Sequence, residues 1–445
     1  MFTRVCLSLV LLGAMPAWSQ VDTNATEAGT NTSDQTQMLT PPPVSSEAYT
    51  TAVGSTIRSN YLRTGWVINT AYSDNVVGGS GTNPISDVSY SIWPTIAIDK
   101  TTTRLHWILN YSPGFTIYQH TSALNQADQN VALDFRYRLS PHVTASARDS
   151  LQKTSNVFNQ PDSFTGGAIS GGVQPQPISV VAPTADQLSN TATMELTYQF
   201  SRNGMIGATG AFTNLHYFDP AEVPGLYDSN SGGGSAFYNH RLSRMHYVGA
   251  TYQYLRFLTY PTTERSETQT HSVLLFYTLY LNPTFSFSVS CGPQHFDVVQ
   301  SPLPIYRSWS PALTASMGRQ GRHMDIAVGY GRTVTSGGGL VGAFLSNSAN
   351  ASAHWQPARA WTLGSTAAYA NNKNVTPSSL QSSSGGHTLT GTVSVQHPLG
   401  ERFNVALGYT RLHQSYSGIP VISNTPNTNL EFISISYQLA RPLGR

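Results

Sequence analysis

A small group of ionisable residues recurs at every second position of neighbouring segments. In an extended strand, alternate side chains point to the same face of the sheet. Carboxylates and guanidinium groups gathered on one wet face can impose ionic preference on a pore, or they can balance one another as ion pairs on a hydrated wall. Both interpretations apply to the same five residues: Asp134, Arg136, Arg138, Arg148 and Glu195.

The register between two of these segments follows from their turn. A three-residue turn at 140–142 would pair Leu139 with Val143 and set Asp134 opposite Arg148. The same register turns Asp149 toward the other, apolar face, where an unpaired carboxylate costs about 2 kcal/mol. We therefore expect either a β-bulge that rotates Asp149 inward or a slip of register there.

Catalytic and metal-binding patterns are missing from the sequence. It has no Gly-x-Ser-x-Gly elbow, no phosphate-binding loop and no His-Glu-x-x-His motif. The 13 histidines are scattered singly, and those near expected strand ends, such as His106, His354 and His397, suit interfacial polar groups better than ligands or bases. The sequence therefore predicts no enzyme, no catalytic residue, no cofactor and no metal site.

Composition narrows the class of protein further. Only 10% of the 445 residues are charged, against about 25% in an ordinary soluble domain, yet the mean hydropathy is a modest −0.21. Small polar residues replace the missing charge, and 23 Tyr and 17 Phe accompany them. A net charge of +2, with scattered basic residues, argues against a nucleic-acid partner. The mixture is typical of a membrane β-barrel.

The N-terminus has the features of a cleavable export signal. Arg4 supplies a positive charge, residues 5–13 form a short apolar run, and Ala17 and Ser19 are small residues at the positions that a signal peptidase reads. We expect residues 1–19 to be the signal peptide. Residues 20–63, rich in Thr, Asn, Ser and Gln, are expected to form a disordered or extended periplasmic segment.

From Thr64 to Leu439 the sequence alternates between apolar and small polar residues. In residues 402–410, for example, Phe403, Val405 and Leu407 oppose Asn404, Ala406 and Gly408. Such alternation over about ten residues places one face against lipid or a core and the other in water. We expect residues 64–439 to form the barrel and residues 440–445 to form a C-terminal tail.

Short and long connections alternate between the expected strands. Short periplasmic turns and long extracellular loops are what an outer-membrane barrel requires, and seventeen connections join eighteen strands with both termini in the periplasm. The fold class predicted is thus all-β, a closed antiparallel up-and-down transmembrane barrel of about 18 strands, with 16 as the alternative. The short connections are at 101–103, 140–142, 201–204, 242–244, 282–283, 319–322, 357–359 and 399–401; the long ones are at 74–86, 119–128, 154–187, 218–231, 258–268, 297–306, 336–342, 373–385 and 415–426.

Aromatic residues gather beside the short turns. Amphipathic rings prefer the headgroup level of a bilayer and form girdles at barrel rims. The expected girdle residues are Trp66, Trp107, Tyr137, Tyr198, Phe200, Phe285, Trp355, Trp361 and Phe403.

Two stretches resemble a narrower family. The segments 72–76 (YSDNV) and 86–94 (SDVSYSIWP) resemble the opening hairpin of the β-barrel porins associated with exopolysaccharide gene clusters, and 135–140 (FRYRLS) is similar to the tyrosine–arginine strand ends of that family. The resemblance covers roughly the first third of the chain. It implies an outer-membrane barrel, is compatible with polysaccharide export, and brings no catalytic chemistry.

Three functions remain open at this point. The first is a porin-like pore in the outer membrane that passes hydrophilic solutes or a saccharide, narrowed by side chains and by the 154–187 segment folding inward. The second is a non-conducting scaffold or adhesion barrel that displays its surface loops. The third is a secreted soluble β-protein. The expected partners are outer-membrane lipid, the outer-membrane insertion machinery, and polysaccharide or small hydrophilic solutes.

Overall fold

The computed structural model describes the chain from residue 60 onward, with gaps at most long connections. The described residues are 60–77, 84–155, 185–219, 226–261, 266–282, 284–300, 304–321, 323–335, 340–358, 360–375, 385–400, 402–417 and 427–443. The expected signal peptide, nearly all of the 20–63 segment, and most of the 154–187 segment lie outside these residues.

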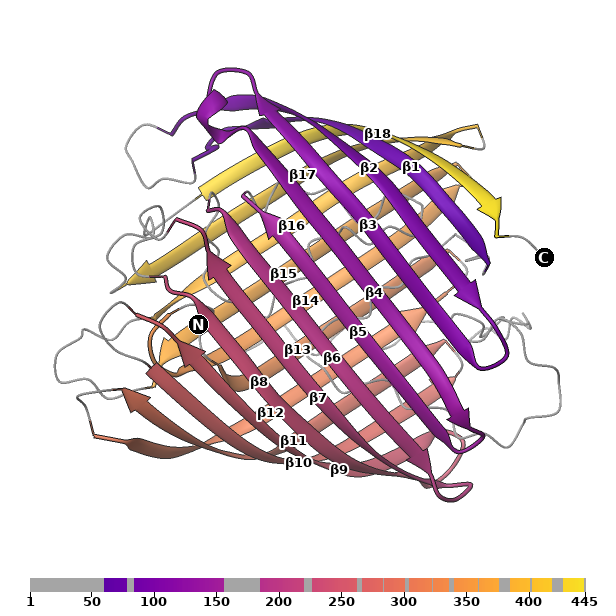
Figure 1. Ribbon diagram of the computed structural model, residues 1–445, viewed down its shortest axis with the longest axis vertical. Coiled ribbons are helices and arrows are strands. Elements are labelled where there is room, and N and C mark those ends of the chain that lie inside the picture. Colours follow the sequence, from indigo (N-terminus) through magenta and orange to yellow (C-terminus); the bar gives the residue numbers. More distant parts are fainter. Residues whose placement is uncertain are drawn as a thin grey trace, which may run out of the picture.

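Long antiparallel strands make up almost all of the described chain (Figure 1). A single turn of 3-10 helix, η1 (Ser122–Leu124), interrupts one connection. No helix of the described residues is long and apolar enough to cross a bilayer. The strands are β1 (Tyr61–Ser73), β2 (Asp87–Thr101), β3 (Leu105–Tyr118), β4 (Gln126–Ser140), β5 (Val143–Thr154), β6 (Gln187–Gln199), β7 (Gly204–Tyr217), β8 (Ser229–Arg241), β9 (His246–Thr259), β10 (Ser266–Asn282), β11 (Phe285–Gln300), β12 (Tyr306–Gln320), β13 (Met324–Thr335), β14 (Phe344–Ala358), β15 (Trp361–Asn374), β16 (Gly385–Leu399), β17 (Phe403–Ser417) and β18 (Asn427–Pro442).

The sheet closes on itself. Each strand pairs with its neighbours in sequence, and β1 pairs antiparallel with both β2 and β18, from Tyr61↔Pro442 to Ser73↔Leu430 at the closing seam. Within the described residues the barrel therefore has eighteen strands, which confirms the predicted fold class and excludes the 16-stranded alternative. It also excludes the open or sandwich-like architecture of a soluble β-protein.

The strands reach slightly beyond the expected barrel boundaries. β1 begins at Tyr61 and β18 ends at Pro442, three residues outside the expected limits at either end. The residues 440–442, expected to belong to a tail, pair with 61–63. Pairing continues there because no turn joins these two strand ends, so the backbone of each can donate and accept hydrogen bonds with the other up to its last residues.

Period-two alternation assigns the two faces of the wall. Ile68 of β1 is aligned with Ile92 of β2 and Ile435 of β18, and all three are exposed on the outside. The adjacent row, Asn69 with its partners Ser91 and Ser434, is buried inside. The outer surface is thus an apolar band and the inner surface is lined mainly by small polar side chains.

The two rims of the barrel differ. All short connections and both strand termini, Tyr61 and Pro442, lie at one rim, which we call the short-turn end. The connections at the other rim, the long-loop end, span up to 32 residues, between Thr154 and Gln187. The strands cross the wall at a pronounced tilt (Figure 1), as barrel closure requires.

The turn between β4 and β5 is tighter than expected. Val143 pairs with Ser140, not with Leu139, and the register shifts by one residue between Arg138 and Ser140. A bulge at the turn absorbs the extra residue, so Asp134 still pairs with Arg148 as predicted. Asp149 pairs with Leu133 in unbroken register and faces outward; neither the bulge nor the slip expected at Asp149 occurs.

Candidate functional site

The five residues of the charged patch (Asp134, Arg136, Arg138, Arg148 and Glu195) all occupy inward-facing positions of β4, β5 and β6. Arg148 donates from Nε to Asp134 Oδ2 at 2.9 Å. This pair is well solvated, since the side chains are 76% and 41% exposed. A solvated pair contributes about 0–1 kcal/mol to stability, so its charges are not needed to hold the barrel together.

The remaining members of the charged patch adjoin this pair. Arg136 and Glu195 both align with Ser146 from opposite sides, and Glu195 interacts electrostatically with Arg136 and Arg148. Arg138 aligns with Thr144, nearer the short-turn end. The structure therefore brings together the charged side chains of three adjacent strands. The charged patch contains more arginines than carboxylates.

Three further ionisable residues extend the charged patch toward the closing seam. Asp99 of β2 lies 3.7 Å from Arg63 Nη2 and 3.5 Å from His106 Nε2 through its carboxylate oxygens. His106 in turn aligns with Arg136. Sequence reasoning missed this extension, although alternation of 87–101 already turns Asp99 to the same face as Ser89 and Ser91.

Solvent reaches only part of the inner wall. On β10, β11, β13, β17, β18, β1 and β2 most inward side chains are buried, for example Thr270, Ser288 and Gln414 at 0–1% exposure. On β4–β9 the inward side chains are buried only near the strand ends. The charged patch on β4–β6 thus lies in an accessible part of the described inner wall, which also includes β7–β9 and the middle of β12 and β14–β16.

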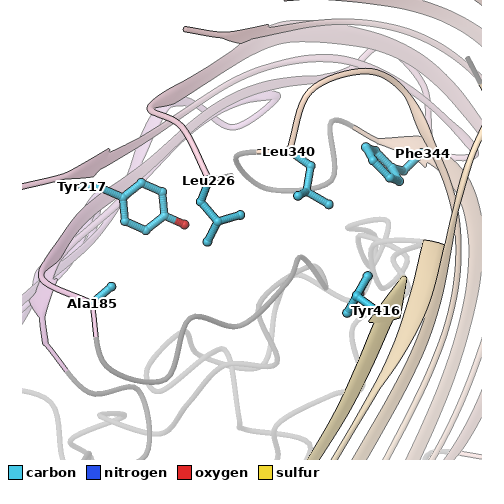
Figure 2. Packing of buried hydrophobic residues seen from close by; sticks show 6 residues of the cluster. All are labelled: Ala185, Tyr217, Leu226, Leu340, Phe344 and Tyr416. Atoms are coloured by element: carbon cyan, nitrogen blue, oxygen red, sulfur yellow. The ribbon is translucent and has the colours of Figure 1, made fainter. Parts of the chain in front are cut away.

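An apolar cluster lies inside the long-loop end (Figure 2). Leu226 and Leu340 come from two different long connections and are 1% and 4% exposed. Leu340 is also tied to β9, where Thr259 Oγ1 donates to its carbonyl oxygen at 3.4 Å. Because β7 and β17 stand eight strands apart by the shorter way round the closed barrel, residues from distant arcs of the wall meet here. We call Ala185, Tyr217, Leu226, Leu340, Phe344 and Tyr416 the mouth cluster.

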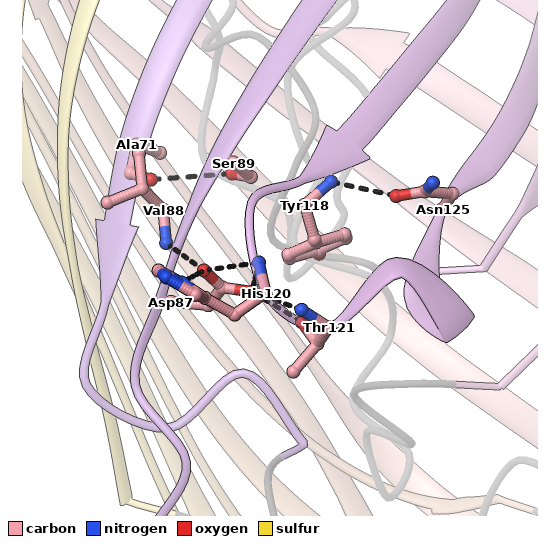
Figure 3. A network of polar contacts seen from close by, with 8 residues as sticks. All are labelled: Ala71, Asp87, Val88, Ser89, Tyr118, His120, Thr121 and Asn125. Carbon is pink, nitrogen blue, oxygen red and sulfur yellow. Dashed lines mark hydrogen bonds and ion pairs between the residues drawn. The ribbon is translucent and has the colours of Figure 1, made fainter.

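A network of hydrogen bonds at this rim holds the connection between β3 and β4 in place (Figure 3). The Asp87 carboxylate accepts hydrogen bonds from the backbone N–H groups of His120 and Thr121 and from the Thr121 hydroxyl, at 2.7–3.2 Å. The side chain of Asn125 accepts from the Tyr118 N–H at 2.8 Å. Because these side chains accept hydrogen bonds from backbone N–H groups of the connection, they fix it against the rim.

The aromatic residues expected near the short turns lie on the outer surface at that rim. Trp66 stacks on Tyr437 with ring centroids 5.9 Å apart and meets Phe403 edge-on. Phe200 covers Gly204, where a Cβ would come within 2.4 Å of its ring, and stacks on Tyr238. By strand alternation the same outer surface carries Trp107, Tyr137, Tyr198, Phe285, Trp355 and Trp361.

No group of His, Cys, Asp or Glu among the described residues is arranged to hold a metal ion. The thiol of Cys291 is free and exposed on the outer face of β11. The chemistry that the described residues offer is therefore electrostatic: a charged, hydrated strip of wall beneath an apolar mouth.

Comparison with known proteins finds distant structural similarity and no sequence match. No protein-family model matches the sequence, and no curated protein matches it. Among solved structures, OccK2 (OpdF) of Pseudomonas aeruginosa is 12% identical, with 86% of this chain and 98% of that chain covered and a TM-score of 0.43. The outer membrane protein opdK of the same organism is 11% identical (85% and 99% covered, TM-score 0.40). The FrpB iron transporter of Neisseria meningitidis is 9% identical (86% and 82% covered, TM-score 0.41). These superpositions are loose, and the assignment to closed 18-stranded β-barrels rests on the strand pairing itself.

Proposed function

We propose that this protein is a porin-like barrel of an outer membrane that lets hydrophilic solutes pass through a water-filled lumen. One observation carries the proposal: a closed barrel turns exposed apolar rows outward and polar rows inward along its whole circumference. Exposed apolar rows on all sides suit hydrocarbon and not water. Barrels of 16–18 strands are also too wide for wall side chains alone to fill.

The aromatic residues of the outer surface support the proposed orientation of the barrel in the membrane. Aliphatic side chains such as Ile68 and Leu407 lie between the aromatic residues of the short-turn end and a second set near the long-loop end, which includes Tyr72, Tyr90 and Tyr369. Two aromatic girdles flanking an apolar band mark the two interfaces of a bilayer. The short-turn end would face the periplasm, after export by the signal peptide and assembly by the outer-membrane insertion machinery.

The proposed path runs along the wall of β4–β9, past the charged patch. Arginine exceeds carboxylate there, so the lumen would favour anions over cations of equal size. No catalytic step is part of the proposal, and the protein is not an enzyme in this view. The resemblance of the 72–94 hairpin to exopolysaccharide-associated porins supports a saccharide as one candidate solute.

Single-channel recording in planar bilayers tests the proposal. Purified protein is expected to give stepwise currents with anion preference. Replacing Arg136 and Arg148 by Gln should shift the reversal potential under a salt gradient toward cations, because two inward positive charges are lost. Replacing Arg256 and Arg307, arginines of the outer surface, by Gln is the matched control and should leave the potential unchanged.

The second candidate is a non-conducting scaffold that displays its loops. The mouth cluster favours it, because six apolar or aromatic residues buried inside the rim narrow the entrance. The same recordings decide between the two. Reproducible absence of current from protein that is folded, as judged by faster gel migration before boiling than after, would overturn the channel and leave the scaffold.

A further inference from the structure

The outer surface of the barrel has two unlike halves at its long-loop end. On β9–β12 both arginines near this end have a carboxylate: Arg256 donates two hydrogen bonds to Glu267, at 2.7 and 2.9 Å, and Arg307 lies 3.7 Å from Asp297. Basic side chains of that half are therefore already compensated.

On β13–β17 none of the described basic side chains near the long-loop end forms an ion pair with a carboxylate. Glu401, beside a short turn, is the sole acidic residue between positions 326 and 430 of the sequence, including the connections. The outer face of these strands nevertheless carries a group of basic side chains near the long-loop end, which we call the basic row: Arg332, Lys373, His387, Arg411 and His413.

The strand register connects Arg332 to His387, whereas Arg411 aligns with Gly391, four residues along β17 from Ser415, the partner of His387. Arg332 aligns with Asn347, Asn347 with Asn371, and Asn371 with His387. The rings of His387 and His413 lie 5.5 Å apart.

The Nε atom of Arg332 is buried without a hydrogen-bond partner among the described residues. Arg411 Nη2 donates to Asn427 Oδ1 at 3.4 Å, and Glu431 of β18 faces outward two residues along that strand from the partner of Arg411. Among the described residues, amide and guanidinium donors therefore stand side by side without an ion pair to a carboxylate.

Beside the basic row the outer surface carries three small residues, in register with Arg411. Ala351, Ala367 and Gly391 follow one another in register on β14, β15 and β16. A Cβ added at Gly391 would meet only a backbone oxygen, at 3.7 Å, so the space above it is open. Larger outward side chains, Val328 on β13 and Val393 on β16, border these residues. We call these three residues the small-residue groove.

We propose that the outer surface of β13–β17 binds a phosphate-bearing lipid of the surrounding leaflet. The phosphate lies on the basic row, and an acyl chain lies in the small-residue groove. Phosphate pairs well with guanidinium, ammonium and amide donors. The basic row lies near the long-loop end, at the level where the outer surface of the barrel passes from the hydrocarbon to the lipid headgroups. The row extends over four interstrand spacings, about 19 Å, so it has room for more than one phosphate group. The inference rests on the membrane location proposed above.

Native mass spectrometry of the full mature chain, released from detergent micelles, measures the binding. The probes are dioleoyl phosphatidic acid and dioleoyl phosphatidylcholine. The wild-type protein should retain phosphatidic acid in preference to phosphatidylcholine. The triple variant Arg332→Gln, Lys373→Gln, Arg411→Gln should weaken that binding by about tenfold or more, since charge-assisted hydrogen bonds are lost.

The matched control removes the same charge from the other half of the rim. Lys153→Gln, Arg256→Gln, Arg307→Gln should weaken the binding by less than about twofold. A second pair of variants tests the groove: Ala351→Phe with Ala367→Phe should displace the lipid, whereas Ala250→Phe with Ala315→Phe, elsewhere on the outer surface, should not.

Equal losses in the two triple variants, or equal retention of both lipids by wild type, would overturn the lipid site. Channel activity is recorded separately in bilayers of phosphatidylcholine alone. Loss of lipid preference with normal currents would refute this inference only, while a chain that fails to insert into any bilayer would refute the proposed function.

Discussion

At the scale of single residues, Asp149 is the most unusual side chain of the outer surface. It lies in the middle of β5 between Leu133 and Ala192, its partners on either side, and one of its carboxylate oxygens is buried without a hydrogen bond among the described residues. A carboxylate facing hydrocarbon is costly unless something compensates it.

We therefore expect Asp149→Asn to stabilise the barrel. The gain should be about 1–2 kcal/mol in the free energy of unfolding, measured by guanidinium titration in lipid vesicles. Asp134→Asn is the control, because it removes a solvated inner carboxylate and should cost less than about 1 kcal/mol. Destabilisation by Asp149→Asn would mean that the carboxylate has a partner in the membrane.

At the scale of elements, the long connections do more than join strands. The mouth cluster brings residues of the β5–β6, β7–β8 and β13–β14 connections together with the ends of β7, β14 and β17. Apolar constrictions restrict ion flow by excluding water. The wall beneath is held by backbone pairing that does not depend on these side chains.

Shortening the apolar side chains of the mouth should therefore widen the entrance without opening the barrel. Leu226→Ala with Leu340→Ala is expected to raise single-channel conductance by about twofold or more. Leu275→Ala, which trims a leucine on the outer face of β10, should change nothing. A double variant with unaltered conductance and intact gel migration would show that the cluster does not limit the current.

At the scale of the whole molecule, closure between β1 and β18 defines the barrel. Thr70 and Ile433 are paired residues on the outer face of this seam. Directly opposed residues of antiparallel strands have Cα atoms within the range that a disulfide spans.

Thr70→Cys with Ile433→Cys, in a Cys291→Ser background, should form that disulfide spontaneously. The cross-link is expected to add about 2–4 kcal/mol to the free energy of unfolding and to give a faster-migrating boiled band without reductant. Thr70→Cys with Val328→Cys, on β13 across the barrel, should remain reduced. Failure of the seam pair to form, with equal thiol reactivity in both variants, would contradict closure.

Much of this molecule is determined by local sequence. Alternation such as Phe403, Val405 and Leu407 against Asn404 and Ala406 predicts which face of each strand is apolar, because side chains on a strand change sides at every residue whatever the rest of the chain does. Turn-forming residues then divide the chain into strands, so their number and antiparallel order also follow from sequence. The pairing of Asp134 with Arg148 belongs to the same level.

Tertiary structure alone decided the rest. Asp99 and His106 join Arg136, and Leu226 meets Leu340, because the folded barrel fixes which side chains are neighbours and which loops face each other over the lumen. The unequal accessibility of the inner wall has the same origin. Alternation says that a side chain points inward, but only the folded barrel decides whether water reaches it.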